Sequence, residues 1–157
     1  MWSTDVIIEE PPLPVRLLAY MRTHVETEGA MLRRYVEVAR TTESQAFAYL
    51  VDLLIEDEMS HHRVFTELAN TLEAEVHDID REPAVPAMDF DRADRDAVLA
   101  GAKELLANEE SDLDELKGLQ HELRALKKTT LWSLLVEQMQ RDTEKHIAIL
   151  KFVCKHV

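Results

Sequence analysis

The chain has 157 residues and a formal net charge of −13, from 31 acidic and 18 basic side chains. This length suits one domain with a sizeable core, and so acidic a chain lacks the basic face that nucleic-acid binding requires. The single cysteine, Cys154, excludes an internal disulfide and any cysteine-rich zinc or iron–sulfur site.

No run approaches the ~18 apolar residues of a membrane span. The segment 1–5 lacks the charged and apolar regions of a signal peptide. We therefore expect a cytoplasmic protein with neither a membrane nor a nucleic-acid partner, whose negative charge attracts metal cations. Gly (3) and Pro (5) are scarce, and the dominance of Ala, Leu, Glu, Arg and Lys favours helices.

In chain order, a tail at residues 1–12 precedes one predicted domain over residues 13–157. Its four amphipathic helices are expected at about 13–40, 43–75, 93–127 and 130–157. The first joint is short, and Thr42 with Gln45 has the spacing of a capping box. The joint near 127–130 is also short but has no Gly or Pro, so one long helix over the last two segments is the alternative there.

The connection at residues 77–92 is longer. It contains Pro83 and Pro86 and has no helical period. A helix of ~30 residues is ~45 Å long, and ~15 extended residues reach ~50 Å, so this linker can run the full length of a bundle. Two short joints around one long crossover predict an all-α four-helix bundle with the crossover between helices 2 and 3. An ordinary surface loop is the alternative.

Each predicted helix has an apolar stripe that is interrupted near its middle by a carboxylate or an imidazole. In an antiparallel bundle the middles of the helices coincide, so these groups would meet in one layer. They are costly to bury unless something pairs with them, and a metal ion does so. The interrupting residues are Glu28 in the first helix, Glu58 and His61 in the second, Glu109 in the third, and His146 with either Asp142 or Thr143 in the fourth.

Taken singly, each of these residues has an ordinary interpretation as a surface carboxylate or a hydrogen-bonded core histidine. Their shared height in the bundle is what favours a metal site. Carboxylates and imidazoles suit iron and manganese, and zinc binds the same ligands. Among the other histidines, His62 lies one position off its stripe and is expected beside the site, whereas His24 and His121 are expected to be exposed.

Three local patterns resemble the ferritin-like superfamily, most closely bacterioferritin and rubrerythrin. The run Asp57-Glu58-Met59-Ser60-His61 matches the Asp-Glu-x-x-His signature of helix 2. Glu28 with Tyr35 is similar to the helix 1 pattern of an iron-ligating Glu and a nearby Tyr, and the segment 142–147 resembles the helix 4 signature. The resemblance implies iron as cofactor, oxidation of Fe(II) by oxygen or peroxide, and Tyr35 as a catalytic residue. It implies metal ligation by Glu28, Glu58, His61, Glu109 or Glu110, and His146, and Asp142 is a further candidate ligand.

The sequence departs from the family pattern at Thr143, where the family has a ligating Glu. Asp142 is one position earlier, so that quadrant of a di-iron site is expected to be weakened. Met59 matches a haem-binding position but also suits an ordinary interface, so haem is not predicted. The fourth predicted helix runs to Val157, so no fifth helix is expected, and a homodimer or small oligomer is favoured over a storage cage. The alternative function is a non-enzymatic ferritin-like scaffold with a decayed or purely structural metal site, acting through helix-mediated association.

Overall fold

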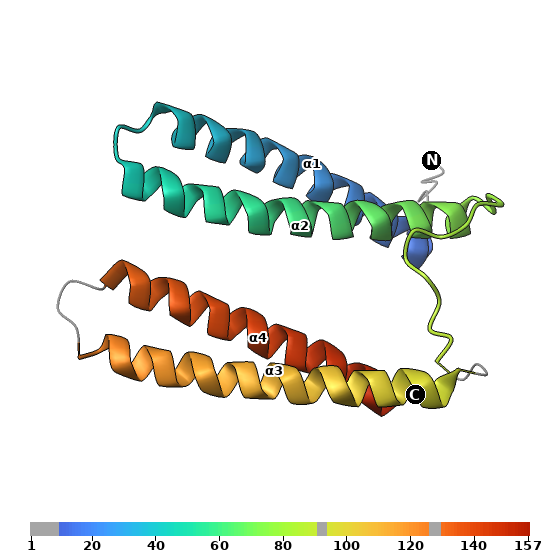
Figure 1. Cartoon of the computed structure of the whole chain (residues 1–157). Coiled ribbons are helices and arrows are strands. Elements are labelled where there is room, and N and C mark those ends of the chain that lie inside the picture. The colour runs from blue at the N-terminus through green and yellow to red at the C-terminus, as the bar shows by residue number, and fades with distance from the viewer. Residues whose placement is uncertain (1–9, 91–93, 126–129) are drawn as a thin grey trace, which may run out of the picture. The chain divides into compact units, whose positions relative to one another are not determined.

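The computed structural model describes residues 10–90, 94–125 and 130–157. Four helices follow one another in the chain, and the described residues include no β-strand (Figure 1). Their bounds are α1 Leu13–Thr41, α2 Gln45–Val76, α3 Arg95–Leu123 and α4 Thr130–His156. The prediction of an all-helical chain with four helices is confirmed, and the alternative of one long final helix is wrong, because α3 and α4 are separate helices that pack on each other.

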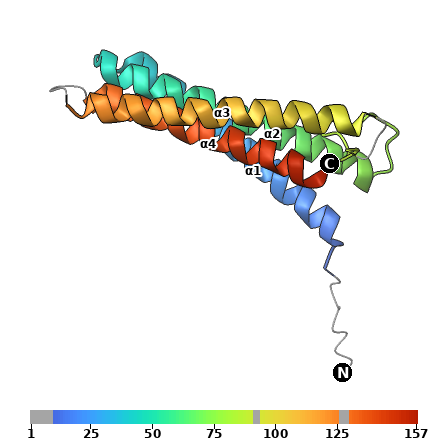
Figure 2. The same cartoon turned by 60° about the horizontal axis from the view of Figure 1, so that its bottom comes forward.

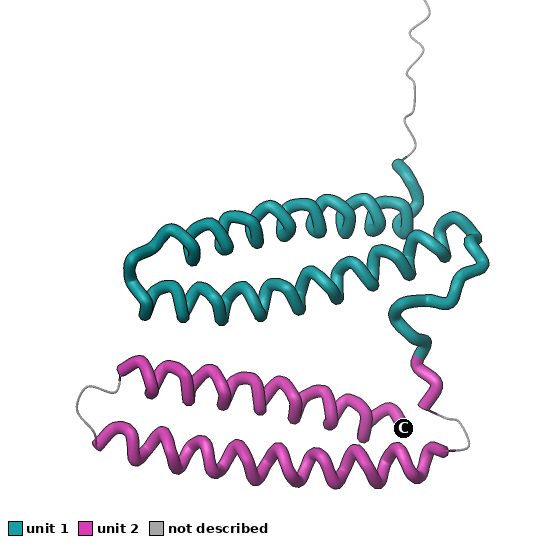
Figure 3. The backbone as a smooth tube through the Cα atoms, turned by 45° about the horizontal axis from the view of Figure 1, so that its top comes forward, with its two compact units in different colours: residues 1–87 teal, residues 88–157 magenta. Residues whose placement is uncertain are grey.

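The chain divides into two compact units, residues 1–87 and 88–157 (Figure 3). The first unit is a helical hairpin in which α1 packs on α2, and the second is a hairpin in which α3 packs on α4. None of the four helices is both long enough and apolar enough to cross a membrane.

The joint between α1 and α2 is capped by Ser44, one residue before the expected capping-box partner. The Ser44 hydroxyl accepts a hydrogen bond from the Phe47 amide at 3.3 Å, and Thr42 accepts one from the Ser44 amide at 3.2 Å. These bonds satisfy amides that the first turn of α2 leaves without a partner. The helix therefore begins at Gln45, two residues later than expected.

The far end of α2 closes with a left-handed residue. Asp78 has φ 48°, and the Ile79 amide donates to the Ala74 carbonyl at 2.8 Å, the pattern of a Schellman motif. Asp takes the position that Gly usually fills, because a short polar side chain tolerates this conformation. Beyond it, the Val85 amide donates to the Thr71 hydroxyl at 3.0 Å. The first part of the linker therefore lies against α2, and the long crossover stays a prediction.

The first hairpin is held together by small apolar residues and one polar clamp. Val51, Ala69 and Ala74 of α2 are buried. Near the open end, Arg22 donates to Asn70 at 3.0 Å and to Glu73 at 2.6 Å across the helix pair. The first turns of α1 diverge from α2 in Figure 2.

In the second hairpin the predicted α3 stripe faces α4, with Ala102 and Leu123 buried. On α4 the buried positions are Val136, Thr143 and Ile147, so the phase that contains Thr143 is the one that faces α3. Gln140 of α4 also donates to the Leu116 carbonyl of α3 at 3.2 Å. This packing decides which polar residues of α4 face the partner helix.

Candidate metal centre

Glu28 is the most deeply buried carboxylate that the structure describes. It lies on the apolar stripe of α1, faces α2, and is only 5% exposed. Its Oε1 atom lies 3.2 Å from Nε2 of His24, one turn earlier on the same helix. Its Oε2 atom has no hydrogen-bond partner. A carboxylate oxygen in such surroundings carries a desolvation cost that a bound cation would offset.

Glu58 and His61 of α2 approach this carboxylate. They are one turn apart, with 3.5 Å between Glu58 Oε2 and His61 Nδ1. The Glu58 side chain is 23% exposed and that of His61 is 63% exposed, so the cluster opens toward the surface of the hairpin. Ligand atoms of Glu28, Glu58 and His61 all lie within 4.8 Å of one another. Among the described residues this is the group of three that is arranged to hold a metal ion.

These residues fit a metal ion on two counts. Two carboxylates and one imidazole are donors that iron, manganese and zinc accept. Two ligands of one ion at ~2.0–2.2 Å are at most ~4.4 Å apart, and the mutual separations of up to 4.8 Å in this group are close to that limit. The structure thus brings together the three ligands that the sequence predicts in α1 and α2.

Two histidines that were not among the predicted ligands also lie against Glu28. His24 was expected to be exposed but is half-buried, with its ring 4.1 Å from that of Phe65. His62 lies with Nδ1 at 3.9 Å from Glu28 Oε2. A spacing of four residues separates His24 from Glu28 and Glu58 from His62, which places each pair on one helix face. That spacing was the signal available in the sequence.

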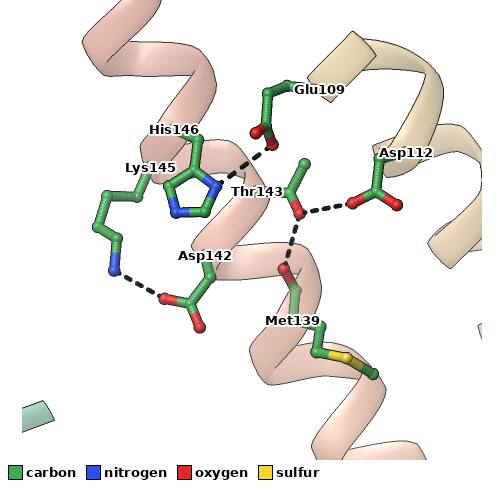
Figure 4. Close-up of polar contacts among 7 residues, drawn as sticks. All are labelled: Glu109, Asp112, Met139, Asp142, Thr143, Lys145 and His146. Atoms are coloured by element: carbon green, nitrogen blue, oxygen red, sulfur yellow. Dashed lines mark hydrogen bonds and ion pairs between the residues drawn. The ribbon is translucent and has the colours of Figure 1, made fainter. Parts of the chain in front are cut away.

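The second hairpin carries a smaller cluster (Figure 4). Glu109 of α3 lies with Oε2 at 3.3 Å from Nδ1 of His146 of α4, so these two predicted ligands do meet. Their side chains are 30% and 48% exposed. Thr143 is buried, and its hydroxyl lies 3.2 Å from Oδ2 of Asp112 and 3.0 Å from the Met139 carbonyl. The position where the family pattern has a carboxylate is thus filled by a hydroxyl that hydrogen-bonds locally.

The other two candidates in this hairpin face elsewhere. Asp142 accepts a hydrogen bond from Lys145 at 2.8 Å, and Figure 4 shows its carboxylate directed toward that ammonium group. Glu110 lies 3.8 Å from Lys151 in an exposed ion pair. Of the two α3 candidates, Glu109 is therefore the one beside His146. Tyr35 is half-buried on α1, two turns after Glu28.

The chain matches no protein-family model, no curated protein and no solved structure. The resemblance to the ferritin-like superfamily therefore stays a hypothesis.

Proposed function

We propose that this protein binds a metal ion through Glu28, Glu58 and His61 of the α1–α2 hairpin, and that the ion is iron. The observation that carries the proposal is the unpartnered Oε2 atom of a carboxylate that is 5% exposed, facing a second carboxylate and an imidazole. Burial of a carboxylate oxygen without a partner is unfavourable in the metal-free protein, and a bound cation offsets this cost.

Each residue has a distinct task in this proposal. Glu28 supplies buried negative charge, Glu58 supplies a second carboxylate at the edge of the cluster, and His61 supplies a neutral nitrogen donor. Bound iron would supply the electron-transfer chemistry for oxidation of Fe(II) by oxygen or peroxide. Tyr35, two turns after Glu28 on α1, is the candidate for a redox role because of the family resemblance.

We also propose that the chain has the ferritin-like four-helix bundle fold that the resemblance implies. Two observations support this. Each hairpin carries a partly exposed carboxylate–histidine pair near its middle. Each also leaves large apolar side chains exposed, including Leu54 and Met59 on α2 and Trp132 on α4. A homodimer or small oligomer would cover further apolar surface of this kind.

A second candidate function is a scaffold whose metal site has decayed. Thr143 favours it, because this buried hydroxyl stands where the family pattern has a ligand and its hydrogen bonds are made within the hairpin. On this reading the exposed apolar side chains serve helix-mediated association without redox chemistry.

Metal content and oxygen reactivity separate the two candidates. The purified full chain would be analysed for bound metals, loaded anaerobically with Fe(II), and exposed to oxygen while the absorption spectrum is recorded. We expect bound iron and an absorption band of oxidised, ligated iron that Glu58→Gln removes and Glu56→Gln retains. Glu56 is a matched control because it is exposed on the same helix. A chain that neither contains metal nor retains added Fe(II) would support the scaffold function.

A further inference from the structure

His62 and Glu28 present two buried polar atoms to each other without a hydrogen bond. Glu28 Oε2 and His62 Nδ1 are both unpartnered, and they are 3.9 Å apart. This distance is too long for a hydrogen bond. Buried polar atoms rarely lack a partner, so we look for a group that Glu28 Oε2 and His62 Nδ1 can both bind.

The separations around Glu28 match those between ligands of one cation. Two donors on the same ion are at most ~4.4 Å apart, and neighbouring donors on a tetrahedral zinc are closer than that limit. Glu28 lies 3.9 Å from His62 and 3.2 Å from His24, in each case through a different carboxylate oxygen. A cation between Glu28 and His62 satisfies both unpartnered atoms at once.

Packing holds both imidazole rings in position before any ligand arrives. The His24 ring lies against Phe65, with the ring centroids 4.1 Å apart. The His62 ring lies over Gly29, where Cε1 would be 3.7 Å from an added Cβ. The two side chains are 36% and 33% exposed. Rings that are already oriented lose less conformational freedom on binding a metal.

We propose that His62, through Nδ1, and His24, through Nε2, bind metal together with Glu28, each beside a different oxygen of its carboxylate. The α1–α2 hairpin then contains a histidine-rich metal site, and α3 and α4 are not needed to complete it. This inference rests on the proposed metal-binding function. Imidazole and carboxylate donors suit zinc as well as iron.

Nitrogen NMR of the full chain tests the inference with zinc chloride as the probe. Zinc is diamagnetic, so the ¹⁵N chemical shifts of histidine rings report directly which nitrogen is bound. We expect one equivalent of zinc to shift Nδ1 of His62 and Nε2 of His24 and to leave His121, exposed on α3, unchanged. His62→Gln and His24→Gln should each weaken zinc affinity more than about ten-fold, the lower end of the effect of changing even an outer contact of a metal ligand. His121→Gln should retain the affinity of the wild type.

Failure of this inference differs from failure of the proposed function. If zinc leaves the His24 and His62 rings of the wild type at their free shifts, and Glu28→Gln abolishes zinc binding, the inference is overturned and metal binding by Glu28, Glu58 and His61 stands. If Glu109→Gln weakens zinc affinity as much as Glu28→Gln does, the claim that one hairpin suffices is wrong. If the wild type binds neither zinc nor Fe(II), the proposed function fails as well.

Discussion

Glu28 places a carboxylate inside an otherwise apolar helix contact, where Leu would serve the fold better. Glu28 is 5% exposed, and its Oε2 atom has no hydrogen-bond partner. The apoprotein therefore bears the cost of desolvating this carboxylate. Replacing buried charged groups by apolar residues of similar volume is often stabilising. The apoprotein thus holds a group whose benefit appears when a cation binds.

The substitution Glu28→Leu tests this balance. We expect it to raise the free energy of unfolding of the metal-free protein by about 1 kcal/mol, because it removes the desolvation cost, and to abolish stabilisation by added metal. Urea melts with and without Zn²⁺ measure both effects. Glu26→Leu is the control, since Glu26 is exposed on the same helix. A fall in apoprotein stability for Glu28→Leu would show that the contact with His24 outweighs the desolvation.

In the second hairpin, Thr143 is a buried uncharged residue at a position where the family pattern has a carboxylate. It is 4% exposed and lies 3.2 Å from a carboxylate oxygen of Asp112. Thr143→Glu should therefore lower apoprotein stability by about 2–3 kcal/mol, because it adds a buried charge beside Asp112. Thr143→Val, which keeps the shape without the charge, should cost less.

Metal should restore part of the stability that Thr143→Glu loses, since a ligand of the folded state stabilises by mass action. The restored carboxylate should also raise the number of Fe(II) ions bound per chain. Melting curves and calorimetric titration of both variants decide the matter. If the wild type already binds two ions per chain and Thr143→Glu adds none, the idea of a weakened quadrant is wrong.

At the scale of the helices, the apolar period predicted which segments are helical better than it predicted which residues face the partner helix. Every position of the α3 stripe is buried or half-buried, namely Leu99, Ala102, Leu106, Glu109, Leu113, Leu116, Gln120 and Leu123. On α2 the stripe through Leu54 and His61 is partly exposed, while Ile55 and His62 turn toward α1. Adjacent residues differ by about 100° around a helix. An apolar period of three and four residues therefore does not decide which of two neighbouring residues faces the partner helix. Packing against the partner helix decides it.

The starting points of helices depend on local hydrogen bonds that the period does not report. For α2 the cap is Ser44, not Thr42. Ser44→Ala should lower the free energy of unfolding by about 1 kcal/mol, because the Phe47 amide loses its acceptor. Ser60→Ala, at an exposed position inside α2, is the control and should be neutral or slightly stabilising. Urea denaturation followed by circular dichroism measures both, and equal effects of the two substitutions would argue against the cap.

At the scale of the whole molecule, each hairpin covers part of its apolar surface. On α2, Phe47 and Leu54 are 49% and 50% exposed, and both belong to the stripe that continues to His61. The linker residues have no apolar period. The sequence therefore predicted the four helices, whereas for the linker it left a long crossover and an ordinary surface loop as alternatives. Our proposal is that a further helical surface covers this stripe.

Leu54→Lys tests that proposal. If the stripe is covered in solution, the charge should lower the free energy of unfolding by more than about 1 kcal/mol or dissociate an oligomer, because it buries an unpaired ammonium group. Ala46→Lys, exposed near the start of α2, should change stability by less than about 0.5 kcal/mol. Melting curves and sedimentation velocity provide the readouts. Equal tolerance of both substitutions would mean that the stripe faces solvent.

The central claim is that the buried carboxylate of α1 is a metal ligand. Anaerobic calorimetric titration of the full chain with Fe(II), for the wild type, Glu28→Gln and Glu26→Gln, tests it most directly. The two substitutions remove one charge each from the same helix, and Glu28 is buried whereas Glu26 is exposed. We predict saturable binding by the wild type and Glu26→Gln and its loss in Glu28→Gln. Equal binding by all three proteins would contradict the account.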